Sequence, residues 1–412
     1  MFSVLRHRGF RNLWLGQAIS QFGDACYYVI FMFMAQKLSG SAEVVGFVGA
    51  IEMLPFLLVG PYGGVLADRF DRKKIMLISD LMSGMTLIGL MLVVVSFQGK
   101  PPIAAIFVTA FLTSCFRSVF LPAKSAAIPN LVSEDELYAA NSLSYMTQSW
   151  MPMIGLALSA SVIGILYSIS ETWFFALSIA INALSFFVSA IYVAKLPEIK
   201  PNRESVDQES HPWQDFVLGM KYLWADGYLR ALMILTGLMS LMISPFFVAY
   251  VQANKQWFGN HPVTLTWFEF SFFAGLLVGG FIVAKLSIRK VGWGFIFGIF
   301  GCGVCVAILA IPNNMMLFVS MNFLAGVFIP FADIPAASHM QSIVDDSYRG
   351  RVNSTLSLVR TASMPLGLGL AGTLIATIGL VKLFLLMGFG MVAVALLGAA
   401  LRPFRNATLQ AK

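Results

Sequence analysis

Apolar residues fill long stretches of this chain, and most polar residues gather in short segments between those stretches. Each stretch is close to the roughly 20 residues that a helix needs to cross the hydrocarbon core of a bilayer. A membrane-spanning β-barrel would instead show ten-residue segments in which polar and apolar positions alternate. The pattern therefore predicts an all-α membrane protein with twelve transmembrane helices. The predicted helices cover residues 12–36, 44–67, 75–97, 103–123, 141–167, 172–195, 228–252, 264–285, 290–311, 315–338, 353–379 and 381–401.

The composition of the chain excludes a water-soluble protein. Of the 412 residues, 58% are hydrophobic and 11% are charged, which is too little polar surface to cover a soluble globule of this length. The first apolar stretch follows Arg6, Arg8 and Arg11 and so resembles a signal peptide. It is too long for one, contains Asp24 and lacks a convincing small-residue cleavage site. We expect it to be retained as a helix.

The distribution of cations predicts the orientation of the chain. Most of the 27 Lys and Arg residues fall in loops on one side, if both termini lie on that side. Cytoplasmic loops carry such an excess, so we expect a protein of the bacterial cytoplasmic (inner) membrane with both termini in the cytoplasm. The net charge of +7 then reflects this bias and contacts with anionic membrane lipids, and it requires no nucleic-acid partner.

The chain contains two related halves. A shift of 212 positions places FLTSCF at Phe111–Phe116 onto FLAGVF at Phe323–Phe328, and Asn141-Ser142 onto Asn353-Ser354. A shift of 216 aligns Gly63-Gly64 with Gly279-Gly280. Parallel repeats of six helices are typical of transporters whose halves rock about a central site.

The longest interior polar segment separates these halves. We predict an N-terminal six-helix bundle at 1–196, a cytoplasmic linker with an amphipathic helix at 197–227, and a C-terminal six-helix bundle at 228–412. Apolar residues recur at helical spacing in the second part of the linker, which favours a helix along the membrane surface.

A dense charge cluster, GGVLADRFDRKK at Gly63–Lys74, lies between the second and third predicted helices. It resembles the signature loop of the major facilitator superfamily, although Asp71 stands where that family usually has Gly. Three further segments are similar to the branch that contains macrolide efflux proteins and the enterobactin exporter. They are FRNLWLGQAISQFGD at Phe10–Asp24, LPAKSAAIPNLVSEDELYAANSL at Leu121–Leu143 and DDSYRGRVNS at Asp345–Ser354. The resemblance implies the major facilitator fold, with two pseudo-symmetric six-helix bundles.

The same resemblance implies that the charged loop is a conformational latch rather than a substrate site. We expect Asp68 to cap or pair with a neighbouring helix end in one conformation, which would stabilise the outward-open state. The alternative is an ordinary solvated loop. The predicted latch residues are Gly64, Asp68, Arg69, Arg72 and Lys73.

A few charged residues fall inside the predicted helices. Each costs at least about 2.5 to 3.5 kcal/mol on insertion scales, so each is a functional candidate. Asp80 lies within two turns of the charged loop, and we expect it to be an interfacial partner for the cations of that loop. The remaining candidates for proton coupling are Asp24, Glu52, Arg117, Glu269, Asp333 and Arg360.

Asp24 is the first candidate for a proton carrier. It shares a helical stripe with Gln17, Ser20, Gln21, Tyr28 and Phe31, so this helix should turn one polar and aromatic face inward. Burial and nearby cations tune the proton affinity of such a carboxylate. The alternative is that Asp24 only makes a polar contact between helices.

The other intramembrane charges leave more alternatives open. Asp333 and Arg360 lie at similar depths below the same surface and could pair, either as a static bridge or as a gate. Glu52 and Glu269 lie nearer the outer surface and could contact a cationic substrate, carry protons, form an outer gate or be structural. Arg117 lies where the superfamily often has an arginine tied to proton coupling.

Aromatic and methionine side chains are abundant, with 36 Phe and 22 Met residues. Such side chains can bind flat or greasy molecules through contact area and soft contacts. Packing between helices and contact with lipid are the alternatives for each of them. The predicted substrate-cavity residues are Gln21, Tyr28, Phe31, Trp150, Met153, Phe247 and Tyr250.

These observations predict a secondary active transporter that exports amphipathic small molecules, such as macrolide-like drugs or a siderophore, by proton-coupled alternating access. A lipid or lysolipid flippase and a proton symporter are alternatives. A membrane enzyme is disfavoured, because the four His residues lie in or near loops without metal spacing and no serine nucleophile motif is present. The chain has no nucleotide-binding loop either. We expect no cofactor and no metal, and a monomer.

Overall fold

The computed structural model describes residues 2–133, 136–200, 212–286 and 288–408. These residues are mostly helical, and the only β pairing among them is an isolated bridge between Lys290 and Thr408. Ten helical segments there are long and apolar enough to cross a membrane. Together with α6 (Leu137–Ile169) and the consecutive helices α2 (Ala42–Leu58) and α3 (Gly60–Arg69), they are consistent with twelve spans. The predicted all-α membrane fold is confirmed.

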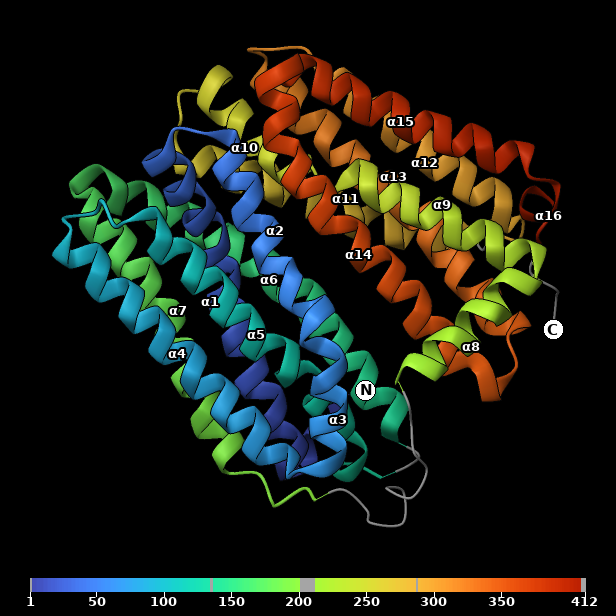
Figure 1. The fold of residues 1–412 in the computed structure, drawn as a ribbon, viewed down its shortest axis with the longest axis horizontal. Coiled ribbons are helices and arrows are strands. Elements are labelled where there is room, and N and C mark those ends of the chain that lie inside the picture. Colours follow the sequence, from blue (N-terminus) through green and yellow to red (C-terminus); the bar gives the residue numbers. More distant parts are fainter. Residues whose placement is uncertain (1, 134–135, 201–211, 287, 409–412) are drawn as a thin grey trace. The chain divides into compact units, whose positions relative to one another are not determined.

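The chain divides into two compact units (Figure 1). Unit 1 comprises Met1–Gly40 and Ile51–Glu209, and unit 2 comprises Ser41–Ala50 and Ser210–Lys412. Each unit is described by itself below.

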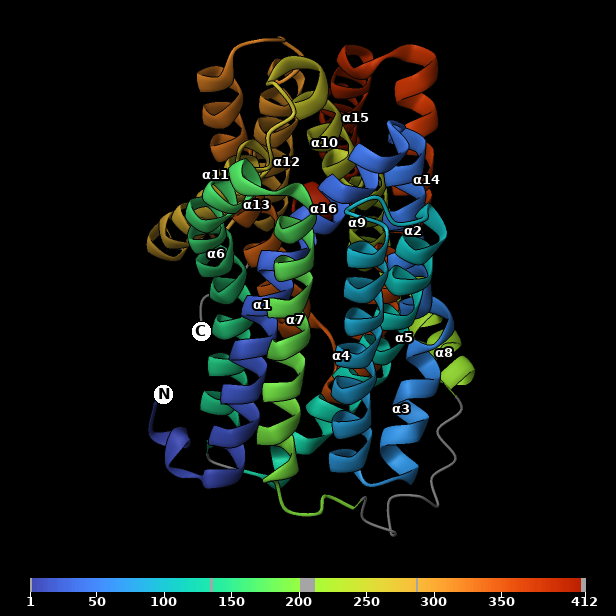
Figure 2. The same cartoon turned by 90° about the vertical axis from the view of Figure 1, so that its left-hand side faces the viewer.

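The helices of unit 1 pack around α1, α4 and α7. α4 lies against both α7 and α5, and α1 lies against α7 and α6 (Figure 2). Small residues explain the close approach of α1 to α7: a Cβ atom on Gly23 would come within 2.2 Å of the Ser185 hydroxyl, and one on Gly16 within 3.1 Å of the Ser189 hydroxyl. Besides α3 and α6, the helices are α1 (Arg8–Ser39), α4 (Arg72–Ser96), α5 (Ile103–Ala127) and α7 (Glu171–Ala194).

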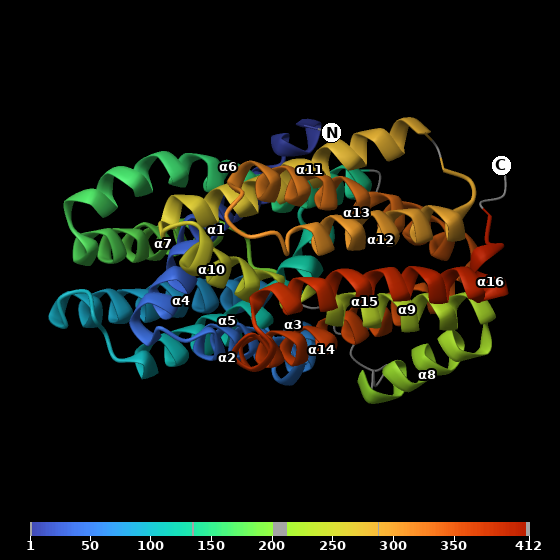
Figure 3. The ribbon, with the colours of Figure 1, turned by 90° about the horizontal axis from the view of Figure 1, so that it is seen from above.

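The helices of unit 2 include a tightly packed group in which α13 lies against α11 and α12, and α12 lies against α15 (Figure 3). Here too glycine permits the contact, because a Cβ atom on Gly279 of α11 would come within 2.2 Å of the carbonyl oxygen of Val327 on α13. The helices are α8 (Pro212–Ala225), α9 (Gly227–Ile243), α10 (Phe246–Trp257), α11 (Pro262–Leu286), α12 (Val291–Ile308), α13 (Met315–Ile343), α14 (Asp346–Ile378), α15 (Leu380–Ala400) and α16 (Arg402–Arg405).

Two predicted spans are interrupted. The span at 44–67 breaks between Leu58 and Gly60, and the span at 228–252 breaks between Ile243 and Phe246. Proline lies at both breaks, as Pro61 in the first turn of α3 and as Pro245 before α10. Proline has no backbone N–H to continue the helical hydrogen bonds of the preceding turn.

The helix expected in the linker is α8. Its Gly219 lies close to Arg351 and Thr355 of α14, so α8 packs onto unit 2. Leu223 is buried and Trp224 is exposed.

Candidate functional site

An ion pair joins α1 to α5 within unit 1. An oxygen of Asp24, Oδ2, lies 3.7 Å from Nη1 of Arg117, and Asn182 of α7 donates a hydrogen bond of 3.3 Å to the other oxygen, Oδ1. The two charged side chains are 27% and 49% exposed. The pair is therefore held loosely and is open to a pocket rather than sealed in the core.

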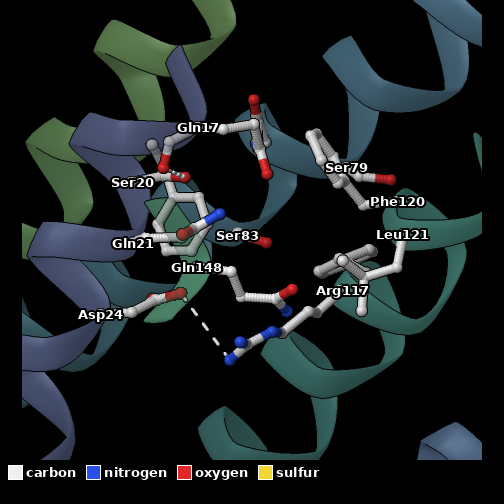
Figure 4. A pocket seen from close by; sticks show the side chains of 13 residues that line it. Gln17, Ser20, Gln21, Asp24, Ser79, Ser83, Arg117, Phe120, Leu121 and Gln148 are labelled. Carbon is white, nitrogen blue, oxygen red and sulfur yellow. Dashed lines mark hydrogen bonds and ion pairs between the residues drawn. The ribbon is translucent and has the colours of Figure 1, made fainter. Parts of the chain in front are cut away.

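The pocket beside this pair is polar and small (Figure 4). Figure 4 shows Asp24 and Arg117 pointing toward each other at one side of it, with Gln17, Ser83 and Gln148 around them. It holds about 40 Å³ of room for water, enough for roughly two or three molecules. Drug-sized ligands need pockets of roughly 300 Å³ or more. The lining residues are Gln17, Ser20, Gln21, Asp24, Ser79, Asp80, Ser83, Phe116, Arg117, Phe120, Leu121, Gln148 and Phe186.

Glu52 of α2 belongs to the same electrostatic neighbourhood. Its charge interacts with those of Arg117 and Asp24. One carboxylate oxygen, Oε2, is buried without a hydrogen-bond partner in the described part of the chain, as is the hydroxyl of Tyr27. Unit 1 thus brings together Asp24, Glu52 and Arg117, three of the six predicted coupling residues.

Asp80 was expected to pair with the cations of the charged loop, and that expectation is wrong. Asp80 is only 2% exposed and accepts a hydrogen bond of 2.7 Å from the hydroxyl of Ser189 on α7. It lies eight residues after the start of α4 at Arg72, which is about 12 Å along the helix axis. That rise carries Asp80 away from the loop and into the lining of the polar pocket.

The loop cations bind backbone carbonyl groups at helix ends. Arg72 donates to the carbonyl oxygens of Ala67 at 3.1 Å and Ala126 at 3.0 Å, near the ends of α3 and α5. Lys73 donates to the carbonyl of Leu196 at 2.6 Å, just after α7. Cations at helix C-termini offset the unpaired carbonyls and the negative end of the helix dipole. The loop therefore ties together the ends of three helices.

Among the other latch residues, Arg69 is exposed, and the side chain of Asp68 lies outside the described part of the structure. The capping carboxylate that the structure shows is Asp71, which accepts from the backbone N–H groups of Lys73 at 3.0 Å and Ile199 at 3.1 Å. Gly64 faces open space, whereas a Cβ atom on Gly63 would come within 2.8 Å of the Ser118 carbonyl oxygen on α5. An Asp directly before a helix is an ordinary N-cap signal, and it could have identified Asp71.

In unit 2, Nη2 of Arg360 on α14 lies 3.3 Å from Oδ1 of Asp333 on α13. The two side chains are 43% and 38% exposed. Glu269 on α11 is half-buried. It makes no ion pair with the residues that the structure describes in unit 2.

The predicted substrate-cavity residues differ in exposure. Gln21 lines the polar pocket. Phe31 and Tyr250 are 3% and 2% exposed, and the hydroxyl of Tyr250 donates to Oδ1 of Asn322 inside a cluster of aromatic rings. These two residues pack the interior of their units. Trp150 is exposed, and Tyr28, Met153 and Phe247 are half-buried.

The polar partners that sequence reasoning missed lie on α4 and α7. On α7, Asn182, Ser185 and Ser189 follow one another at spacings of three and four residues. On α4, Ser79 and Ser83 are four residues apart. Polar residues at this spacing within an apolar helix indicate one polar face. That signal could have identified both helices as walls of the pocket.

Comparison with known proteins decides the family. Residues 13–256 match the sequence profile of the Major Facilitator Superfamily. The chain belongs to this superfamily. Macrolide efflux protein A of Streptococcus pyogenes is 28% identical to this facilitator over 406 residues, which cover 97% of this chain and 98% of that protein. The multidrug efflux pump Tap of Mycobacterium tuberculosis is 25% identical over 404 residues, or 94% and 92% of the two chains.

Solved structures show the same fold. A nucleoside transporter crystal structure superposes with a TM-score of 0.70 at 14% identity, covering 95% of this chain and 99% of that one. A proton-dependent oligopeptide transporter gives a TM-score of 0.71 at 11% identity, covering 97% and 98%. Its family and its apolar helices make the facilitator a transporter and an integral membrane protein, as its sequence predicts.

Proposed function

We propose that this facilitator exports amphipathic small molecules, such as macrolide-like drugs, in exchange for protons by alternating access. The similarity to macrolide and multidrug efflux proteins over nearly the whole chain supports the substrate class. The observation that carries proton coupling is the Asp24–Arg117 pair beside a pocket with room for water only. A charged pair in that position can exchange protons without binding the exported molecule.

The proposed coupling step is a change in the charge of Asp24. When its carboxylate gains a proton, the attraction to Arg117 is lost, and α1 and α5 lose one interaction that joins them. Losing the proton restores it. A difference in interaction energy between the two protonation states is what allows a proton to shift a conformational equilibrium. Glu52 lies within the field of both charges and adjusts the balance between them.

The substrate would bind elsewhere in the transporter, because the polar pocket is too small for it. Tyr28, Trp150 and Met153 are partly exposed in unit 1 and remain proposed contacts. The cation distribution supports a cytoplasmic position for the charged loop and both termini, and we propose that the transporter acts as a monomer.

Transport in liposomes tests the proposal. Purified protein is reconstituted, a macrolide or the fluorescent cation ethidium is added, and the lumenal pH is followed with a trapped dye. We expect the wild type to move protons only when substrate moves, and Asp24→Asn to lose at least about tenfold of that coupled movement. Glu43→Gln is the matched control, because it removes a carboxylate that is exposed at the start of α2.

Glu52→Gln should reduce coupling by less than Asp24→Asn, because Glu52 acts through the field that it shares with the pair. Substrate movement without protons in the wild type would indicate a uniporter or a flippase. Wild-type coupling in Asp24→Asn would remove Asp24 from the mechanism.

A further inference from the structure

Lys124 of α5 is a largely buried lysine for which the described residues offer no charged partner. It is 9% exposed, and its ammonium group makes no hydrogen bond or ion pair with the described residues of unit 1. Three less buried cations of this unit do have partners: Arg72 and Lys73 bind helix-end carbonyls, and Arg117 pairs with Asp24. An isolated ammonium that leaves water is costly unless it is paired. Its position therefore needs a reason.

The surroundings of Lys124 place it next to the proposed coupling site. It lines a small cavity with room for about 10 Å³ of water, which is the lower limit for holding one molecule. Gln17 and Gln21 line this cavity and also line the pocket of the Asp24–Arg117 pair. Two amide side chains thus separate the cavity of Lys124 from the pocket of Asp24.

These amide groups can continue a hydrogen-bonded path. An amide offers both an acceptor oxygen and donor N–H groups, and the side-chain oxygen of Gln21 is buried with no partner in the described structure. Ser144 of α6 adds a hydroxyl group to the same cavity. With one water molecule in each cavity, polar groups extend from Asp24 to Lys124.

The helices packed against α5 supply few charges near Lys124. Two of these charges, Asp24 on α1 and Asp80 on α4, lie in the adjoining pocket. A third, Arg72, binds the carbonyl of Ala126, two residues beyond Lys124. On α3, Arg69 is exposed and the Asp68 side chain is not described. On α5 itself, Arg117 lies two turns earlier and its charge reaches Lys124. Among the described side chains of α6, Ser144 and Thr147 line this cavity.

We propose that Lys124 is a second proton carrier, which takes the proton that Asp24 releases and passes it to the water at the charged-loop end of unit 1. The carboxylic acid of Asp24 loses a proton to become a carboxylate that pairs with Arg117, and the neutral amine of Lys124 gains that proton to become an ammonium. The ammonium then returns to the amine by giving the proton to water. This relay rests on the proposed function, because it needs Asp24 to carry protons.

Three substitutions separate a relay from simple packing. Lys124→Met fills the same volume without a titratable group, Lys124→Arg keeps a charge that is never released, and Lys124→His restores a group that can gain and lose a proton near neutral pH. Replacing a buried charge by an apolar side chain of similar size is often neutral or stabilising. If Lys124 serves only packing, Lys124→Met should transport as the wild type does.

The measurement is ethidium-driven proton movement in liposomes at several pH values, together with equilibrium binding of ethidium to the detergent-solubilised protein. We expect Lys124→Met and Lys124→Arg to lose at least about tenfold of the proton movement while ethidium binding stays within about twofold. Lys124→His should retain most of the proton movement. As the pH is raised, its proton movement should decline at a lower pH than that of the wild type. Lys100→Met removes an exposed lysine and serves as the control.

Asp24→Asn is measured in parallel, so that the two proposals can fail separately. If Asp24→Asn abolishes coupling and Lys124→Met and Lys124→Arg match the wild type, the relay is wrong and the proposed function stands. If Asp24→Asn itself couples normally, both are wrong. A loss of ethidium binding in Lys124→Met would overturn the relay in favour of a substrate contact. If Lys124→Met fails to fold, the other two variants still test the relay. Equal ethidium-driven proton movement by Lys124→Arg and Lys124→His would overturn it.

Discussion

The two units each hold one intramembrane Asp–Arg pair, and the surroundings of the two pairs differ. Asp24 and Arg117 are 3.7 Å apart beside a polar pocket, and an amide from a third helix also binds the carboxylate. Asp333 and Arg360 are 3.3 Å apart and join the consecutive helices α13 and α14. A group that changes charge during transport needs water and alternative hydrogen bonds around it. The pocket in unit 1 supplies both.

Elsewhere in unit 2, a buried polar network is built from neutral side chains. Asn322 of α13 donates to the hydroxyl of Ser271 at 2.9 Å and accepts from Tyr250, within a packed aromatic cluster. A fully satisfied neutral network fixes helices in place. The proposed proton chemistry therefore belongs to unit 1, and we propose a more static role for this neutral network of unit 2.

The largest effect should come from removing Arg117, and the matching change in unit 2 is the removal of Arg360. Arg117→Leu strands Asp24 beside the pocket, and since the pair is partly exposed the cost is roughly 1.5 to 3 kcal/mol, or about ten- to a hundredfold in coupled transport. Arg360→Leu should lower coupling by less than about threefold. Both variants are compared in the liposome assay after their thermal stability is checked. A larger loss from Arg360→Leu would reverse the comparison.

Paired glycines offer a test in which the two units should behave alike. Gly63 of unit 1 and Gly279 of unit 2 lie at helix crossings, where an added Cβ atom would come within 2.8 Å and 2.2 Å of a carbonyl oxygen, whereas Gly64 and Gly280 face open space. We expect Gly279→Val to destabilise by about 1 to 3 kcal/mol, and Gly63→Val by somewhat less.

The matched controls are Gly64→Val and Gly280→Val, which meet no neighbouring atom within 4 Å and should differ little from wild type. Thermal unfolding in detergent measures all four. Equal destabilisation by the crossing glycines and their neighbours would show that helix propensity, rather than contact between helices, sets the cost.

The smallest effect concerns the charged cluster that Glu136 forms with Arg6 and His7 in unit 1. Glu136 accepts from Arg6 at 3.1 Å and contacts Nε2 of His7 at 2.6 Å. The hydrogen bond with His7, supported by those of Ser133 and Arg6, lowers the pKa of Glu136 from its usual 4.5. At the position 212 residues later, Tyr348 stacks on Tyr222 with ring centroids 4.9 Å apart, so a neutral aromatic ring stands where unit 1 has a carboxylate.

The pKa of Glu136 is lower in the folded state, so the ionised carboxylate stabilises the folded protein above about pH 4.5. This contribution is lost as the pH falls through the folded-state pKa. Glu136→Gln should therefore lower the melting temperature slightly at pH 7, and the difference from wild type should shrink toward pH 4. Tyr348→Leu is the comparison in unit 2, and its effect should not depend on pH over that range. A difference for Glu136→Gln that grows on acidification would contradict the assigned interactions.

The sequence by itself determined which segments enter the membrane. The favourable free energy of moving apolar side chains out of water adds up over a whole helix, and this sum outweighs the details of packing. It also determined the family, the repeated glycine pair and the set of charged residues inside the helices. It did not locate the breaks at Leu58 and Ile243, although proline marks both.

Only the tertiary structure decided which residues meet. Asp24 and Arg117 belong to helices that are not consecutive, and Asp80 turned out to face Ser189 rather than the charged loop. Composition decides whether a segment spans the membrane. The rotation of each helix and its depth against its neighbours decide which side chains contact each other. Small residues such as Gly23 set those positions through contacts with another helix. Local sequence therefore supplied the charges of this transporter, and packing between helices gave each charge its neighbours.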